Sequence, residues 1–240
     1  MKSKSFVLTV PEVDREQHAF IDVYRDHGVD DGHRRPLIIF VHGGPLPPNM
    51  QPAPRDWPAF VGYGSLAANE GAVGVTLEHH MHSLADCAAT VEEISTAIEQ
   101  ARSLPDVDPD KVALWFFSGS GILVSDWLRD PPSWLTCVAL TYPVLDFLPE
   151  WEVDSRFHPI TALEAHSAGS LPILLTRVGI EKPEFAAGVE AFAAAANSNG
   201  IGLDIIDVPD GRHGFDMLEA TDASRAAVTE AMDWVVGNLV

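Results

Sequence analysis

The sequence is poor in cysteine and in basic residues, and both shortages narrow the classes of protein that it can represent. It has two cysteines among 240 residues, Cys87 and Cys137, and neither lies in a CxxC or CxxH pattern, so no structural zinc site is expected. Lysine and arginine number 15 against 35 aspartates and glutamates, for a formal net charge of −20. Such a surface repels phosphate groups, which argues against a nucleic acid or an anionic membrane as partner.

Long apolar runs are also missing. No stretch approaches the ~20 residues that a transmembrane helix needs, and the apolar run at 6–10 is too short for a signal peptide. We therefore expect a cytoplasmic protein with no membrane partner, present as a monomer or homodimer. The chain has 46% hydrophobic residues and no low-complexity linker, so residues 1–240 are expected to form a single domain.

The chain does have strand-like and helix-like segments in alternation, which is typical of a mostly parallel sheet with helices on both faces. Apolar runs suited to burial on both faces of a sheet occur at 37–41 and 112–117. Amphipathic spacing predicts a helix over 85–103. Further strands are expected at 6–10, 19–25, 73–77, 136–140, 172–176 and 203–208, the first two as an edge hairpin, and further helices at 60–68, 122–128, 185–197 and 224–239.

A serine follows the second of these apolar runs. The sequence SGSG (118–121) comes directly after it and leads into a predicted helix. A strand that turns sharply into a helix exposes the turn residue and needs small neighbours, as in the general pattern G-x-S-x-G. We favour Ser118 as nucleophile because it abuts the strand end, and Ser120 is the alternative. Phe116 stands where the pattern has its first glycine and is a candidate for narrowing the substrate pocket.

A histidine and an acid follow later strands. His213 lies in a turn between the last strand and the last helix, where a general base could reach the serine. In chains with such a serine the order is serine, acid, histidine. Glu181 follows the strand at 172–176 and would orient the imidazole, with Asp146 as the competing acid.

Glycines supply a fourth part of the site. Gly43 and Gly44 follow the first buried strand, and glycines let backbone N–H groups approach a tetrahedral oxyanion closely. The N–H of Gly119, just after the favoured serine, would complete this oxyanion hole.

Four segments in this order resemble the α/β-hydrolase superfamily, and more narrowly its dienelactone-hydrolase-like and small carboxylesterase branch. The resemblance covers about residues 36–240 and implies the α/β-hydrolase fold, with a central, mostly parallel sheet of about eight strands. Relatives usually carry glycine in place of Phe116 and aspartate in place of Glu181. The segments are 38–45 (IIFVHGGP), 108–121 (DPDKVALWFFSGSG), 174–181 (LLTRVGIE) and 209–216 (PDGRHGFD).

A cluster of histidines follows the strand at 73–77. His79, His80 and His82 could suggest a metal, but neighbours at a strand end point to opposite faces, so we expect no metal and no cofactor. We expect His80 to line the substrate pocket, together with His42.

These features predict a serine carboxylic-ester hydrolase with a small-molecule ester or thioester substrate. The only segment available for a cap is 147–170, so the cap is expected to be minimal. Two alternatives stay open. One is a biosynthetic thioesterase, transacylase or cyclase with the same triad, and the other is a non-catalytic protein of the same fold that binds a ligand.

Overall fold

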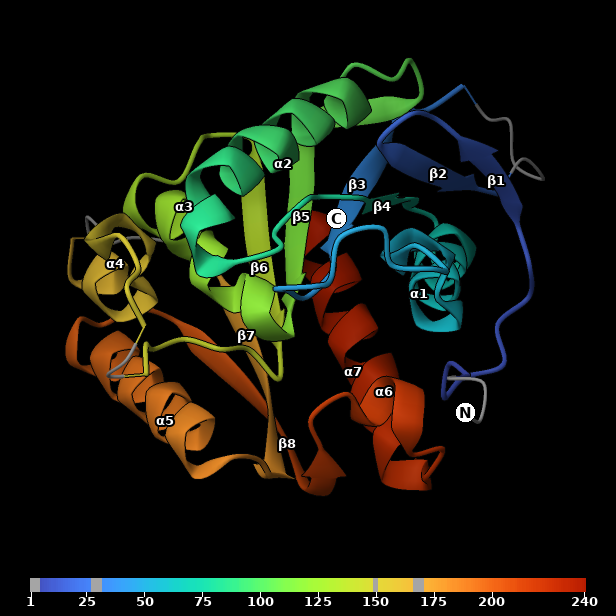
Figure 1. Cartoon of the computed structure of the whole chain (residues 1–240). Helices are drawn as coiled ribbons and strands as arrows, with labels where there is room; N and C mark the ends of the chain where they lie inside the picture. The colour runs from blue at the N-terminus through green and yellow to red at the C-terminus, as the bar shows by residue number, and fades with distance from the viewer. Residues whose placement is uncertain (1–4, 27–31, 149–150, 166–170) are drawn as a thin grey trace.

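The computed structural model describes residues 5–26, 32–148, 151–165 and 171–240. Its centre is an eight-stranded sheet with strand order β1-β2-β4-β3-β5-β6-β7-β8 (Figure 1). The two pairings that involve β2 are antiparallel and all the others are parallel. The strands are β1 (Asp14–Gln17), β2 (Ile21–Arg25), β3 (Arg35–Val41), β4 (Val73–Leu77), β5 (Val107–Phe117), β6 (Leu135–Thr141), β7 (Ile173–Ile180) and β8 (Leu203–Arg212).

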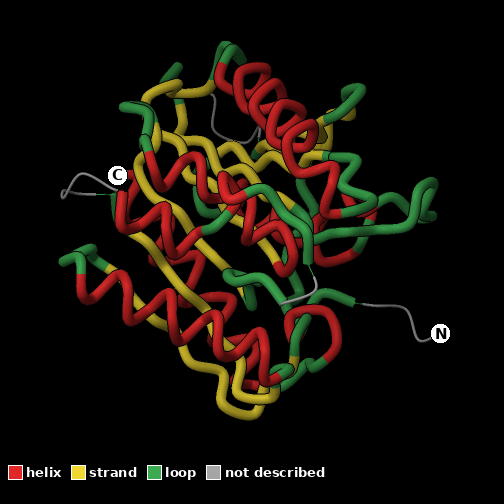
Figure 2. The backbone as a smooth tube through the Cα atoms, turned by 60° about the vertical axis from the view of Figure 1, so that its left-hand side comes forward, coloured by secondary structure: helices red, strands yellow, loops and turns green. Residues whose placement is uncertain are grey.

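Helices cover both faces of this sheet, as Figures 1 and 2 show. One buried cluster joins the sheet to α2, α3, α4 and α5, and a second cluster joins its other face to α1 and α7. The helices are α1 (Pro58–Asn69), α2 (Cys87–Arg102), α3 (Ser125–Arg129), α4 (Pro159–Ala165), α5 (Pro183–Ser198), α6 (Phe215–Leu218) and α7 (Asp222–Leu239), with 3-10 turns η1 (Pro54–Asp56), η2 (Leu84–Asp86), η3 (Ser118–Val124) and η4 (Ser155–Phe157). Among the described residues, no helix has the length and apolar character needed to cross a bilayer.

The central strands form where the apolar runs predict them. Residues 37–41 and 112–117 are fully or almost fully buried, because each strand has neighbours on both edges and helices on both faces. Parallel pairing brings the carboxyl ends of β3, β5, β6, β7 and β8 to one edge of the sheet. The polar and glycine-rich turns that follow these strands therefore meet at that edge.

The edge hairpin forms, but its first strand differs from the predicted one at 6–10. The strand is Asp14–Gln17, which pairs with β2, whereas the apolar run at 6–10 is not a strand. Val7 is instead buried against the face that carries α1 and α7, and its N–H donates to the carbonyl oxygen of Asp216 at 3.0 Å. Alternating apolar residues thus serve a packed loop here, and the exposed polar run makes the edge strand.

Candidate active site

Ser118 lies on a strained turn at the carboxyl end of β5. Its φ angle is +56°, in the left-handed region that residues other than glycine seldom adopt. The turn is held in place because the carbonyl oxygen of Ser118 accepts a hydrogen bond from the Val144 N–H at 2.9 Å. The geometry presents the hydroxyl beyond the strand end, as expected for a nucleophile at a strand-to-helix turn.

Ser118, His213 and Glu181 form a continuous hydrogen-bonded chain. Ser118 Oγ lies 2.6 Å from His213 Nε2, and His213 Nδ1 lies 2.5 Å from Glu181 Oε2. The pairing of β7 with β8 explains the second contact. Ile180 is the register partner of Arg212, so the next residue on each strand is Glu181 or His213.

The Glu181 carboxylate is well shielded from solvent, with 7% of its side chain exposed. Burial alone raises its pKa, but hydrogen bonds from His213 and from the Lys182 N–H outweigh that effect, and its pKa lies below the ordinary value. Glu181 is therefore ionised at neutral pH and can accept a hydrogen bond from the protonated Nδ1 of His213. That contact fixes the tautomer in which Nε2 is free to take the proton of Ser118.

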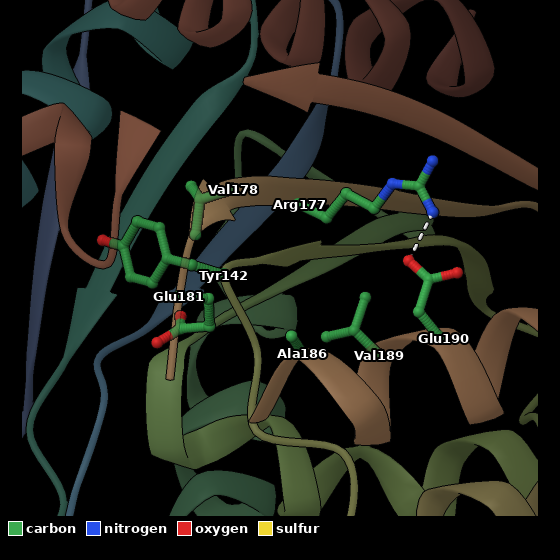
Figure 3. Close-up of a pocket in the computed structure, with 7 residues that line it drawn as sticks. All are labelled: Tyr142, Arg177, Val178, Glu181, Ala186, Val189 and Glu190. Carbon is green, nitrogen blue, oxygen red and sulfur yellow. Dashed lines mark hydrogen bonds and ion pairs between the residues drawn. The ribbon is translucent and has the colours of Figure 1, made fainter. Parts of the chain in front are cut away.

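Behind the acid is a small cavity of about 30 Å³ between β7 and α5 (Figure 3). In Figure 3, Glu181 and Tyr142 lie at one end, and Arg177 pairs with Glu190 at 2.7 Å at the other. This space is comparable to the volume that one water molecule occupies in the liquid. Glu181 therefore borders a small cavity on the side that faces α5. The lining residues are Tyr142, Arg177, Val178, Glu181, Ala186, Val189 and Glu190.

Two glycine positions pack directly against the serine turn. A Cβ atom on Gly43 would lie 2.8 Å from Ser118 Cβ, and a Cβ atom on Gly119 would lie 1.6 Å from the carbonyl oxygen of Gly44. Any larger residue at 119 would collide with backbone. The close approach follows from the pairing of Val41 with Phe116, which places the residues after β3 beside those after β5. Gly43 thus lies beside the Ser118 side chain, and Gly44 lies against the backbone of Gly119.

Ser120 occupies a different position from Ser118. It is fully buried, and its Oγ accepts a hydrogen bond from the Phe117 N–H at 3.1 Å. Its hydroxyl has the carbonyl oxygens of Phe117 and Val41 within 2.8 and 3.1 Å as acceptors. Ser120 therefore ties the turn to β3, and it does not line the cavity that opens beside Ser118.

Asp146, the competing acid, contacts a different histidine, His158. Its Oδ1 lies 3.1 Å from His158 Nε2 and accepts the Phe147 N–H at 2.8 Å. Of the two acids weighed from the sequence, Glu181 is the one that contacts the histidine.

Phe116 does not line the cavity that opens beside Ser118, contrary to expectation. Its side chain is fully buried, lies 5.6 Å from the Trp127 ring and belongs to the core on the face that carries α2 to α5. Alternation along β5 directs the next residue, Phe117, to the other face, where it borders the cavity. The phenylalanine that replaces the first glycine of the pattern therefore packs in the core and does not narrow the cavity.

His42 is likewise buried rather than part of the cavity wall. Its ring stacks on that of His79 with centroids 3.7 Å apart, and its Nδ1 donates to the carbonyl oxygen of Gly43 at 2.8 Å. His79 Nε2 donates to the carbonyl oxygen of His42 at 2.8 Å. Burial, together with nearby histidines, lowers the pKa of His42 well below its ordinary value, and burial lowers that of His79 to about 4. The neutral pair supports the backbone that carries Gly43.

His80 and His82 lie at a separate surface pocket and not at the cavity beside Ser118. His80 is half exposed and its Nδ1 lies 3.0 Å from Glu93 Oε1, while His82 Nδ1 donates to the carbonyl oxygen of Leu46 at 2.9 Å. The expectation that His80 lines the substrate pocket is therefore wrong. Within the described part of the chain, no three His, Cys, Asp or Glu residues are grouped so that they could hold a metal ion.

A cavity of about 240 Å³ opens beside Ser118 and His213. Its walls are mainly aromatic and aliphatic, and its described lining holds no aspartate, glutamate, lysine or arginine. Most of these residues carried no signal in the sequence, because they come from loops and short helices whose course depends on tertiary packing. The lining residues are Gly43, Gly44, Pro45, Leu46, Trp57, Phe60, Phe117, Ser118, Tyr142, His213, Gly214, Met217 and Leu218.

The segment 147–170 does not contribute to this lining where it is described. Its helix α4 packs against α3 and α5 instead. Residues 149–150 and 166–170 of this expected cap lie outside the described residues.

Comparison with known proteins identifies the architecture. No family model and no curated protein sequence matches the chain. Among solved structures, the apo form of Thermogutta terrifontis esterase 2 is similar with a TM-score of 0.69 and 19% identity, covering 97% of this chain and 98% of the esterase. DphMB1 is similar with a TM-score of 0.67 and 18% identity, covering 97% of this chain and 89% of DphMB1.

A third structure, a putative dipeptidyl aminopeptidase IV from Bacteroides ovatus, has a TM-score of 0.71 and 15% identity over 89% of this chain and 33% of its own. Together with the eight-stranded, mostly parallel sheet and its flanking helices, these likenesses show that the chain has the α/β-hydrolase fold. At such low identity they concern the fold alone.

Proposed function

We propose that this chain is a serine hydrolase that cleaves small, uncharged carboxylic esters through an acyl-enzyme on Ser118. The observation that carries the proposal is the hydrogen-bonded chain from Ser118 through His213 to Glu181 at the wall of an apolar cavity. The fold is shared with Thermogutta terrifontis esterase 2, which has also been solved phosphorylated by paraoxon. This likeness supports an esterase and leaves the substrate to be argued from the cavity.

In this mechanism Ser118 Oγ attacks the ester carbonyl carbon while His213 Nε2 takes its proton. Glu181 stabilises the imidazolium that forms, and N–H groups of Gly43 or Gly44 and of Gly119 stabilise the oxyanion. His213 then returns the proton to the departing alcohol. Water, activated by the same histidine, releases the acid and restores Ser118.

The size of the cavity limits the substrate. A 150 Å³ apolar cavity takes up benzene, so in proportion 240 Å³ accommodates an apolar group of about ten non-hydrogen atoms. A long lipid chain exceeds this volume. The absence of lysine and arginine from the described lining disfavours acyl groups that carry a carboxylate, because nothing there would compensate for desolvation of the charge.

The two alternatives raised by the sequence have unequal support. A non-catalytic role was motivated by Phe116 filling the acyl pocket, and that side chain lies in the core instead. Transfer of the acyl group from a thioester, or to an acceptor other than water, would use the same triad. The narrower likeness to dienelactone-hydrolase-like esterases stays a prediction.

A p-nitrophenyl ester series from acetate to palmitate tests the proposal. We expect kcat/KM to rise by up to about fourfold for each added methylene, since each buried CH₂ is worth ~0.8 kcal/mol. The rise should end near octanoate, where the cavity is full, and palmitate should be poor. The hexanoate ester, compared with the p-nitrophenyl monoester of adipic acid, isolates the charge because both have six-carbon acyl groups. Absence of turnover on every ester, or equal turnover of this pair, contradicts the proposal.

A further inference from the structure

Near His213 lies a second carboxylate that the mechanism above does not use. Asp216 is 1% exposed and lies on α6, three residues after His213. Its Oδ2 accepts a hydrogen bond from the Tyr63 hydroxyl at 3.0 Å, and its Oδ1 accepts one from the Tyr142 hydroxyl at 2.8 Å. Among the described residues, no lysine or arginine forms an ion pair with it.

Tyr142 connects this carboxylate to the active site. Its ring lies 4.8 Å from the His213 ring and borders the substrate cavity, while its hydroxyl is directed to Asp216. The backbone of Tyr142 is strained, with a φ of +37°, and its N–H donates to the Thr176 carbonyl oxygen at 2.8 Å. Strain of this kind persists only where surrounding contacts hold the residue in place, and it gathers at functional sites.

Burying the Asp216 carboxylate with two neutral hydrogen-bond donors costs more free energy than burying a neutral side chain of the same shape. Burial raises the pKa of Asp216 to about 6, although the hydrogen bonds from Tyr142 and Tyr63 and the nearby His213 act in the opposite direction. An asparagine would have nearly the same shape without the cost of desolvating a charge. The carboxylate thus has a property that packing alone does not require, namely its charge.

We propose that Asp216 is a positioning residue that acts by its charge: held near His213 by Tyr63 and Tyr142, it favours the imidazolium that forms when His213 Nε2 takes the proton of Ser118. It complements Glu181, which contacts Nδ1 directly. Asp216 touches neither the substrate cavity nor the reacting atoms, so it acts through space and through the Tyr142 ring. The catalytic consequence rests on the proposed esterase function, but the effect on His213 does not.

The groups that can titrate around this pair come from several elements. Tyr63 on α1 and Tyr142 after β6 face Asp216, and His213 is close enough to interact with its charge. Ser118 at the end of β5, Glu181 at the end of β7 and Tyr142 face His213, and Lys182 adjoins Glu181. Tyr63 and Tyr142 stay protonated at neutral pH because burial, with the adjacent Asp216 charge, raises their pKa values well above the ordinary value.

The test is an NMR titration of the His213 imidazole in the full chain without substrate, in the wild type and in Asp216→Asn. We expect the pKa of His213 to fall by about half a unit to one unit in Asp216→Asn, which corresponds to a three- to tenfold weaker preference for the imidazolium. Asp210→Asn is the matched control, because it removes an exposed charge from β8 three residues before His213 and should leave this pKa unchanged.

Activity gives a second readout. The acid limb of the kcat/KM profile on p-nitrophenyl butyrate should move to lower pH in Asp216→Asn by the same amount, with a three- to tenfold lower plateau. If Asp216→Asn does not fold, Tyr63→Phe serves instead. It removes one donor to the carboxylate, makes the charged form less favourable, and should lower the His213 pKa in the same direction by a smaller amount.

An unchanged His213 pKa in folded Asp216→Asn, or an equal change in Asp210→Asn, overturns the proposal and leaves Asp216 with a packing role. Loss of activity with an unchanged acid limb has the same meaning. If the wild type shows the His213 shift on mutation but hydrolyses no ester, the inference about Asp216 stands and the proposed function fails.

Discussion

Replacing Asp216 by asparagine is expected to stabilise the folded chain at alkaline pH and to leave its stability nearly unchanged in acid. The folded-state pKa of Asp216 is about 6, above an ordinary value of 3.8. The folded state therefore holds this proton more tightly than the unfolded state does. The contribution of Asp216 to the free energy of unfolding is therefore most favourable below about pH 4 and declines as the pH rises to about 6.

The size of the effect follows from the two pKa values. At 1.36 kcal/mol for each pKa unit, ionised Asp216 lowers the free energy of unfolding by about 3 kcal/mol above pH 6. Asparagine resembles the protonated acid in shape and hydrogen-bonding capacity, so Asp216→Asn should recover about 3 kcal/mol at pH 8 and almost nothing at pH 4.

Urea denaturation at these two pH values measures the difference directly. Titration of groups remote from Asp216 affects both proteins alike and cancels in the comparison. Asp210→Asn, which changes an exposed carboxylate, should shift stability by less than about 0.5 kcal/mol at either pH. If Asp216→Asn destabilises the chain by similar amounts at pH 4 and pH 8, the reasoning about a buried, costly charge is refuted.

Three further substitutions probe the site. Glu181→Gln should reduce kcat by about 10⁴-fold through the wrong histidine tautomer, whereas Asp146→Asn, whose partner is His158, should retain wild-type kcat on p-nitrophenyl butyrate. Gly119→Ala should reduce kcat by about 10²–10³-fold, the effect of losing one oxyanion donor, because the added Cβ would collide with the Gly44 carbonyl oxygen. Gly237→Ala is the control, since a Cβ there meets open space, and a similar loss of kcat in this control would contradict the reasoning. Ser120→Ala should keep most of its activity but lose about 1–3 kcal/mol in urea denaturation, since the buried Phe117 N–H loses its acceptor; inactivation with full stability would contradict this structural role.

The fold was largely predictable because its central strands consist of uninterrupted runs of apolar residues. The runs at 37–41 and 112–117 need burial on both faces, and the turns after them carry the residues that meet at the sheet edge. Ser118, Glu181 and His213 each follow a strand and occur in the order serine, acid, histidine, which was enough to propose their roles as nucleophile, acid and base. Their contacts depend on strand pairing beyond the expected ends, as with Ile180 and Arg212.

The walls of the site could not be read in the same way. Met217 and Leu218 belong to the short helix α6, and Trp57 lies in an irregular segment, so no periodic pattern marks them. His42 and Phe116 were expected in the pocket because of their neighbours in sequence. The stacking of His42 on His79, and the alternation that turns Phe116 into the core, are tertiary facts. For the same reason nothing in the sequence linked Asp216 to the tyrosines that hold it.

The most direct test of the central claim is covalent labelling by paraoxon, followed by mass spectrometry of the tryptic peptide 112–129, which contains both Ser118 and Ser120. The account predicts one phosphoryl adduct, located on Ser118, which disappears in Ser118→Ala and persists in Ser120→Ala. No adduct on the wild type, or an adduct on Ser120, would contradict the assignment of Ser118 as the nucleophile.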